Sequence, residues 1–470
     1  MMSYGISHVA ATALIILSVE TGAHRPVTVR QIIDSSGDGA GNRLSSALGA
    51  AVDGAGNVYV TGKSSQNAFR ITPDGSIIQI IDLTGDGSAK LASPHIVVAD
   101  VAGNAYVCGK HSNNVFRITP EGVITEVINA NGDGTGHVLD KPRGMAVADD
   151  GSVYVAGELS DNAFRVAPDG SITQIIDASG DGAGNTLVGA RGVAVDDAGN
   201  VYVTGRYSDN VFQITPGGVI TQIIDESGDG AGNTLSFPMG VAVGSTRNVY
   251  VSAVVSTNVF KITPRGEIAE IIDATGDGMG NALSHPRAIG VDGAGNVYVT
   301  GKNDGSVFRI TPGGAVAVII DESGGSTGNP FIDPNDNSIS VTESGAVYVT
   351  GTRSDNVFEI ILGDPIPAVS TGVWSSCCYS CSASARSPFA KCVHHAPAPR
   401  ERCGLRPGRL VRRGEAVVRQ VLRSRLRASD ARVSTHHRGV LHRPGDRVDG
   451  GRGLLGCVRR HLSGGVNLNR

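Results

Sequence analysis

The chain repeats itself seven times over most of its 470 residues. A short motif centred on a tyrosine returns every 47 to 50 residues. Repeats of this length belong to stacked or circular architectures in which each unit packs against its neighbours. A fold assembled from unrelated elements is therefore excluded for this part of the chain. The tyrosines are Tyr59, Tyr106, Tyr154, Tyr202, Tyr250, Tyr298 and Tyr348.

A complete unit contains four short apolar runs. In the unit from Gly192 to Leu235 they read GVAV, NVYVTG, NVFQIT and VITQIID. The runs are rich in Val, Ile, Thr, Tyr and Phe, and turn-forming residues bound each of them, which is typical of strands. No segment of the unit has the apolar period of a helix. Four strands per unit predict the blades of a β-propeller, and apolar residues on both strand faces fit sheets packed between two others.

The ends of this series predict how the ring closes. The seventh unit stops after the strand around Phe358, without a fourth strand, while a spare strand of the fourth type, VTVRQIID, stands at residues 27–34. Pairing these two strands completes the seventh blade and removes two open sheet edges. We therefore predict an all-β fold, a seven-bladed propeller of four-stranded blades over residues 27–362, closed by its N-terminal strand.

One pattern runs through the units. It is carried by Pro238, Gly240, Val241 and Val243 in the first strand, by Gly199 to Val203 around the second, and by Ile214, Thr215, Pro216 and Gly218 after the third. In this pattern the units resemble NHL repeats, a family of propeller modules, here of a bacterial secreted or surface type. The resemblance implies the propeller fold. It says little about activity, because propellers host many unrelated functions.

The first 26 residues differ from the repeats. They include the apolar run VAATALIILSV at residues 9–19. This run is too short to span a bilayer but fits the core of a signal peptide, so we expect an extracellular or cell-surface protein. No Lys or Arg precedes the run, which leaves a stray apolar leader as the alternative.

The segment 363–470 is rich in Arg and Cys. Residues 371–470 carry 20 Lys and Arg against 5 Asp and Glu, whereas the first 370 residues carry 20 against 39. We expect this tail to be disordered, without a packed domain. A zinc site at CCYSC and a nucleic-acid-binding arm are both disfavoured, because no second CxxC follows and no aromatic residues are interleaved with the arginines.

The start of the tail suggests its origin. Residues 366–370, followed by Trp374, resemble the beginning of the IPTL-type bacterial C-terminal sorting signal. In that family an apolar membrane span and a short Arg tail come next, but here Arg-rich sequence without a stable membrane span follows. We hypothesise that a reading-frame slip after about Ser370 replaced the sorting signal.

A second motif, D-x-[ST]-G-D-G-x-G-N, lies between the fourth strand of one unit and the first strand of the next. Oxygen-bearing residues at positions 1, 3 and 5, with Gly at 6, suit a Ca²⁺ loop, but no copy supplies the Glu expected at position 12. The alternative is a turn held by side-chain-to-backbone bonds, with no cofactor. The candidate Ca²⁺ ligands are Asp34, Asp38, Asp177, Asp181, Asp225, Asp229, Asp273 and Asp277.

Two kinds of loop should share one face of the propeller, which we call the top face: the second-to-third strand turns and the loops leading into the first strands. The turns vary most between repeats, as at Arg206 and Tyr207, which indicates either a specialised surface or neutral drift. Arg143, Arg191 and Arg287 enter first strands and would favour an anionic ligand in the channel, or pair with nearby Asp. The predicted ring is Leu48, His95, Arg143, Arg191, Met239, Arg287 and Asn337.

Two functions are consistent with these features. We favour a non-catalytic binding propeller, because enzymes usually interrupt their repeats at the active site and these repeats are regular. The alternative, implied by the NHL resemblance, is a lactone hydrolase or lyase with His95, His111 and Glu158 as catalytic residues and His137 nearby. We expect a monomer whose partner is a protein or a small anionic ligand on the top face, and not nucleic acid.

Overall fold

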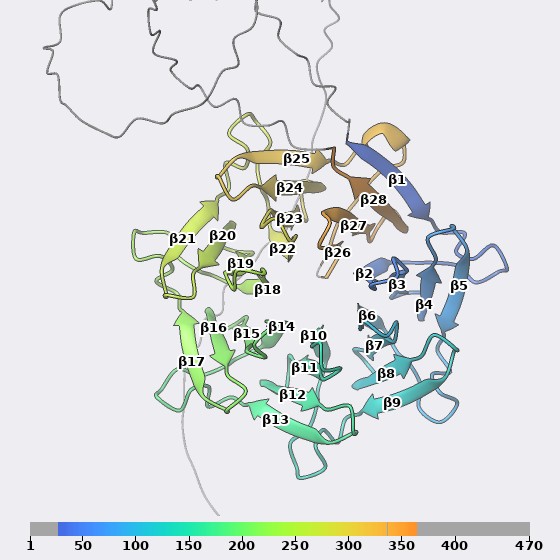
Figure 1. The fold of residues 1–470 in the computed structure, drawn as a ribbon, viewed down its shortest axis with the longest axis horizontal. Helices are drawn as coiled ribbons and strands as arrows, with labels where there is room; N and C mark the ends of the chain where they lie inside the picture. The colour runs from blue at the N-terminus through green and yellow to red at the C-terminus, as the bar shows by residue number, and fades with distance from the viewer. Residues whose placement is uncertain (1–26, 336, 364–470) are drawn as a thin grey trace, which may run out of the picture. The chain divides into compact units, whose positions relative to one another are not determined.

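The described residues form a seven-bladed propeller. The structure, a computed structural model, describes residues 27–335 and 337–363. Its strands make seven separate antiparallel sheets of four strands, arranged as blades around a central axis (Figure 1). In each blade the first strand lies nearest the axis and the fourth lies at the periphery. The predicted fold class is confirmed.

Six blades use four consecutive strands, and the seventh combines both ends of the series. Blades 1 to 3 comprise β2 (Ala47–Val52), β3 (Val58–Gly62), β4 (Asn67–Ile71) and β5 (Ile77–Ile81); β6 (Pro94–Ala99), β7 (Ala105–Gly109), β8 (Asn114–Ile118) and β9 (Ile124–Ile128); β10 (Pro142–Val147), β11 (Val153–Gly157), β12 (Asn162–Val166) and β13 (Ile172–Ile176). Blades 4 to 6 comprise β14 (Ala190–Val195), β15 (Val201–Gly205), β16 (Asn210–Ile214) and β17 (Ile220–Ile224); β18 (Pro238–Val243), β19 (Val249–Ala253), β20 (Asn258–Ile262) and β21 (Ile268–Ile272); β22 (Pro286–Val291), β23 (Val297–Gly301), β24 (Ser306–Ile310) and β25 (Val316–Ile320). Blade 7 comprises β26 (Ile339–Val341), β27 (Ala346–Gly351), β28 (Asn356–Ile361) and β1 (Thr28–Ile33), and a 3-10 turn, η1 (Gly325–Thr327), precedes it.

The seventh blade closes the ring as the sequence predicts. Its strand order is β26, β27, β28 and β1, and β1 runs antiparallel to β28, with Thr28 opposite Ile361. Arg30 lies opposite Glu359, and their side chains form an ion pair with 2.8 Å between Nη2 and Oε2. The last blade therefore depends on a strand from the other end of the sequence.

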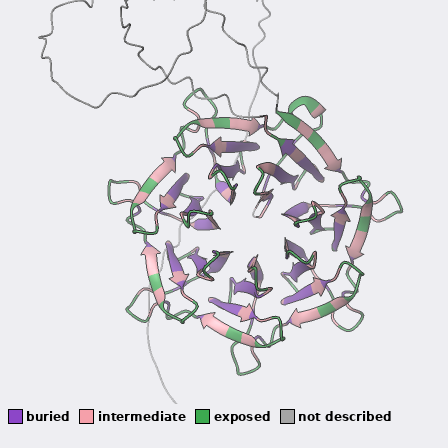
Figure 2. Cartoon of the chain, in the orientation of Figure 1, coloured by how far each residue is buried: buried purple, intermediate pink, exposed green. Residues whose placement is uncertain are grey.

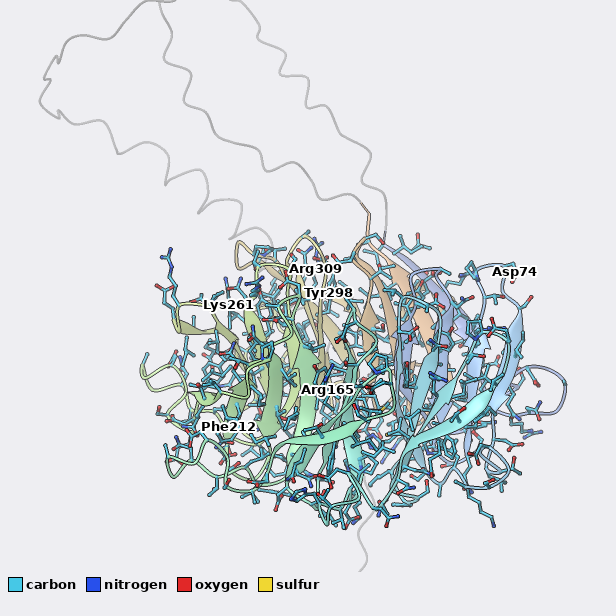
Figure 3. All side chains as sticks on the ribbon, turned by 60° about the horizontal axis from the view of Figure 1, so that its bottom comes forward. Asp74, Arg165, Phe212, Lys261, Tyr298 and Arg309 are labelled. Carbon is cyan, nitrogen blue, oxygen red and sulfur yellow. The ribbon has the colours of Figure 1, made fainter. Side chains whose placement is uncertain are left out.

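The core lies between the blades. Seven clusters of buried apolar residues each draw on two neighbouring sheets. Second and third strands are mostly buried, whereas the fourth strands are mostly partly buried, with an exposed second position and a buried last residue, as in β5 (Figure 2). Phe212, labelled in Figure 3, is fully buried, as is the third-strand phenylalanine of every other blade. Apolar residues on both faces of the inner strands thus pack against two neighbours, as the sequence pattern indicates.

Candidate anion site on the top face

The two kinds of top-face loop contact one another. The N–H of Lys110, in a second-to-third turn, donates to the carbonyl of Ser93, in a loop leading into a first strand, at 3.2 Å. Glu158 donates in the same way to the carbonyl of Lys141 at 3.1 Å. The predicted sharing of one face is confirmed, so side chains from both loop types meet there.

Polar side chains fasten neighbouring blades on this face. Oδ1 of Asp161 accepts a 2.6 Å bond from the N–H of Gly189 in the next blade, and Asp209 accepts one of 2.6 Å from Phe237. All four of these residues have φ between 50° and 69°, a conformation that Asp and Gly adopt more readily than most residues. These hydrogen bonds between blades hold in place the turns that carry the candidate site.

Irregularities in the first strands aim the ring residues at the channel. The register of strand pairing shifts between Pro142 and Gly144 in β10, where Arg143 lies. A bulge of this kind redirects a side chain. The next residue must be glycine, because a Cβ at Gly144 would stand 1.9 Å from the carbonyl oxygen of Arg191 in the next blade. The same irregularity includes Arg191 in β14 and Arg287 in β22.

Three of the arginines converge on one carboxylate. Glu158 Oε1 accepts hydrogen bonds from Arg191 Nη1 at 2.7 Å and from Arg206 Nη1 at 2.5 Å, and Oε2 lies 2.6 Å from Arg143 Nε. Glu158 and Arg191 are buried, at 4 % and 3 % exposure. Burial alone would raise the pKa of Glu158, but Arg191, Arg143 and Arg206 lower it below its ordinary value. We call these four residues the Glu158 cluster.

Aromatic rings hold Arg206 in place. Its guanidinium lies 4.9 Å from the centroid of the Tyr207 ring and 4.1 Å from that of Phe237, within the range of cation–π contacts. The two rings meet edge to face at 5.6 Å. The predicted pair Arg206 and Tyr207 is thus built into an ordered arrangement with Glu158 and Phe237.

A cavity of about 300 Å³ occupies the channel beside this cluster. Most of the residues that line it are apolar, but polar atoms make up the larger part of its surface, and Arg143, Arg191 and Arg287 are among the lining residues. Arg287 Nη1 donates to Asn335 Oδ1 at 2.9 Å. Of the predicted ring, Met239 and Asn337 also line the cavity, whereas Leu48 and His95 are buried and do not. Concave sites that combine apolar side chains with a few placed polar groups are the usual form of a small-molecule site.

Positive charge dominates the neighbouring turns. Partial burial and the charge of Arg143 lower the pKa of Lys110 to about 8, although Glu158 acts in the opposite direction. Partial burial and the charges of Lys110, Lys141 and other cations likewise lower the pKa of the exposed His111. Desolvation is the larger cause of both shifts, and the contributions of the neighbouring cations indicate positive charge around these turns, which attracts anions.

The three candidate catalytic residues have different surroundings. Glu158 contacts arginines, His95 is buried, and His111 is exposed. His137 is exposed and pairs with Asp133 through a 2.7 Å contact between Nδ1 and Oδ2. Within residues 27–335 and 337–363, no group of three or more His, Cys, Asp or Glu lies close enough together to hold a metal ion. The catalytic assignment stays a prediction.

The Asp-rich loops are held by internal bonds. Oδ1 of Asp177 accepts from both the N–H and the hydroxyl of Ser179, at 2.8 and 2.5 Å, and Oδ1 of Asp181 accepts from the N–H of Ala183 at 2.9 Å. Gly180 has φ 64°, and a Cβ there would stand 1.8 Å from the carbonyl oxygen of Asn185. Local bonds and glycine geometry account for the motif as a turn, and Ca²⁺ binding stays a prediction. Equivalent Asp bonds hold the loops of Asp34, Asp38, Asp225, Asp229, Asp273 and Asp277.

Sequence reasoning missed two features of this site. It paired the arginines with Asp residues in general, and it grouped Glu158 with histidines. It also overlooked Phe237, although this position carries a small, polar or charged residue in the other six blades, as at Gly189. The same comparison of repeats would have marked Glu158, which stands where four other blades carry Lys or Arg.

The predictions for the two chain ends lie outside the described residues. These are the signal peptide within residues 1–26, the sorting-signal resemblance, the frame slip and the disordered tail within 363–470, of which only residue 363 is described. Among the residues that the structure describes, no helix is long and apolar enough to cross a membrane.

Comparisons with known proteins give a likeness of fold. Neither protein-family models nor curated proteins match the chain. Among solved structures, it is similar to a streptogramin B lyase, with 14 % identity over 72 % of this chain and 98 % of the other, at a TM-score of 0.56. Virginiamycin B lyase from Staphylococcus aureus is 16 % identical over 72 % of this chain and 100 % of the other, at a TM-score of 0.56. Kuenenia stuttgartiensis hydrazine synthase is 15 % identical over 68 % of this chain and 96 % of the other, at a TM-score of 0.50. At these identities the chain shares a propeller architecture with these proteins, and its resemblance to NHL repeats stays a prediction.

Proposed function

We propose that the protein is a non-catalytic binding propeller that holds a small anionic ligand at the top of its central channel. The observation that carries this proposal is the cavity of about 300 Å³, in whose walls three arginines, Arg143, Arg191 and Arg287, stand among apolar side chains. Guanidinium groups bind carboxylates and phosphates through directed, charge-assisted hydrogen bonds. The apolar side chains would contact the body of the ligand.

The Glu158 cluster supports an anionic ligand. Arg143, Arg191 and Arg206 already bind one carboxylate with contacts of 2.5 to 2.7 Å, so guanidinium donors beside the cavity have the spacing that a carboxylate requires. The lowered pKa of Lys110 supports a positive potential on the same side of the ring. Both observations favour anions over neutral or cationic ligands.

Calorimetric titration with phosphate, citrate, succinate and acetate tests the proposal. Arg287→Met is the informative variant, because Arg287 lines the cavity without contributing to the Glu158 cluster. Arg309→Met is the matched control, since Arg309 lies on β24 of the same blade and also donates to an asparagine, Asn296, at 3.1 Å. We expect at least one anion to bind, with affinity reduced in the first variant only. Absence of binding, or equal losses in both variants, would contradict the proposal.

A second function, a lactone hydrolase or lyase, has one observation in its favour. The fold is shared with streptogramin B and virginiamycin B lyases. Its catalytic residues would be His95, His111 and Glu158. Assays on a panel of lactones and cyclic depsipeptides, with His95→Ala and His111→Ala compared with the control His285→Ala, distinguish this function from binding alone. Turnover that both candidate variants abolish and the control retains would establish it.

A further inference from the structure

Exposed apolar side chains gather on the top face beside the Glu158 cluster. Leu159, Tyr207 and Val255 occupy equivalent turn positions in blades 3, 4 and 5 and are 53 %, 54 % and 65 % exposed. Three consecutive blades therefore share an apolar side chain, and we call these three residues the apolar sector. The equivalent residues of the other four blades are polar: Ser64, His111, Asn303 and Arg353.

Direct contacts extend this sector across blades 4 and 5. The N–H of Tyr207 donates to the carbonyl of Val188 at 3.0 Å, and Val188 is itself 37 % exposed. The Tyr207 ring meets the Phe237 ring at 5.6 Å, and the carbonyl of Phe237 accepts from the N–H of Val254 at 3.1 Å. The apolar groups thus lie on linked loops and are not scattered over unrelated parts of the surface.

The exposure of these side chains favours a macromolecular partner. Small-molecule sites are concave and enclose most of the ligand, and none of the three sector residues lines the channel cavity. Side chains that are more than half exposed instead present area to a broad, complementary surface. Aromatic residues and arginines with few accessible conformations are the groups that carry most of the affinity in protein interfaces.

Tyr207 and Arg206 have this restricted character. The Arg206 guanidinium is stacked on two rings and bound to Glu158, so its conformation is largely set before a partner arrives. A side chain ordered in advance loses less entropy on binding. The sector therefore offers a rigid centre of the kind that protein interfaces use.

Charge sets the chemistry of the partner. Arg206 adjoins the sector at blade 4, and Lys110 and Lys141 lie in the turn of blade 2 and in the loop leading into blade 3, where cations influence one another. The Asp-rich loops lead into the first strands farther along the same face and carry negative charge. An acidic group of a partner would accordingly lie toward the channel, and the partner's apolar side chains would lie on the sector.

We propose that the apolar sector docks a polypeptide segment that combines apolar side chains with an acidic residue, the apolar groups packing on Leu159, Tyr207 and Val255 and the acidic residue facing Arg206. This docking surface is separate from the channel cavity, so it does not depend on the small-anion function. A failure of either proposal would leave the other in place.

Selection from a displayed library of short random peptides tests this surface. The full chain is the target, and affinities of the enriched peptides are then measured by fluorescence anisotropy. The sector variant replaces Leu159, Tyr207 and Val255 with Ser, the residue that blade 1 carries at this position. The matched control replaces three apolar residues of the opposite-face turns that are also more than half exposed, Val101, Val123 and Val219, with Ser.

We expect enriched peptides to contain apolar residues and Asp or Glu, and to bind the sector variant about tenfold or more weakly than the wild type or the control. Changing their acidic residue to the amide should also weaken binding, and added salt should reduce it. Equal melting temperatures of the two variants would confirm that folding is intact. Absence of enrichment, enrichment of basic peptides, or equal losses in both variants would overturn the proposal.

Discussion

Replacing Glu158 with Ala should destabilise the propeller strongly. The Glu158 side chain is 4 % exposed, and its carboxylate forms ion pairs with Arg143, Arg191 and Arg206. Removing one partner of a buried ion pair costs about 3 to 5 kcal/mol, because the remaining charges stay buried without it. At about 2 °C per kcal/mol for a domain of this size, we expect the melting temperature to fall by roughly 6 to 10 °C.

A double-mutant cycle separates this effect from general damage to the fold. In an Arg206→Met background one of the three cations is gone, so Glu158→Ala should cost less than it does in the wild type. Chemical rescue provides a second check, because phosphate or acetate should raise the melting temperature of Glu158→Ala more than that of the wild type. Calorimetry measures all four proteins. A melting temperature of Glu158→Ala within a degree or so of the wild type would refute the reasoning.

The pH dependence of this loss follows from the lowered pKa of Glu158. Since the arginines depress the pKa of the folded state below the ordinary value of 4.5, the stabilisation is complete above about pH 4.5. It is lost as the pH falls through the lower, folded-state value. The difference in unfolding free energy between wild type and Glu158→Gln should therefore be constant near neutral pH and shrink in acid. A difference that grows in acid would contradict the assignment.

Three further outcomes are expected. Deleting residues 27–34 removes β1 and exposes an edge of blade 7, so the free energy of unfolding in urea should fall by several kcal/mol; an unchanged midpoint would contradict the closure. Asp304 stands where the other blades carry Ser, and burial raises the pKa of its carboxyl to about 6. Above pH 6 the charged, partly buried carboxylate is unfavourable, so Asp304→Ser should stabilise the fold by about 1 kcal/mol after allowance for solvent screening. This gain should decrease as the pH falls toward 3.8, the ordinary value for Asp. Melting curves at several pH values check this, and equal stabilisation at pH 4 and pH 8 would be inconsistent with it. If the Asp-rich loops are turns only, millimolar Ca²⁺ should leave the melting temperature unchanged, because backbone N–H groups already bind carboxylate oxygens such as Oδ1 of Asp181; a rise that EGTA reverses and Asp181→Ala abolishes would establish the predicted Ca²⁺ site.

Much of the fold could be predicted because each repeat contains the complete pattern of a blade. The spare strand at residues 27–34 even identified the closure, since an unpaired edge at Phe358 and an unpaired strand must find each other. The channel positions of Arg143, Arg191 and Arg287 also followed, because the entry to each first strand lies at the same radius in every blade.

The side-chain partners could not be predicted in the same way. Whether Glu158 reaches Arg206 in the next blade or a histidine in the previous one depends on side-chain direction and on the spacing of blades, which the repeat pattern does not encode. His95 is buried away from the channel cavity although β6 carries, between Pro94 and Val97, the same irregularity as the strands of Arg191 and Arg287. Phe237 acts through its contact with Arg206 across a blade boundary, 31 positions away in sequence.

Crystals soaked in selenate test the central claim most directly, since selenium marks a bound oxyanion by its anomalous scattering. The account predicts an anomalous peak in the channel cavity, within hydrogen-bond distance of a guanidinium nitrogen of Arg143, Arg191 or Arg287. The peak should weaken in crystals of Arg287→Met. Selenate peaks found only elsewhere on the surface, with none in the channel, would contradict the proposed anion site.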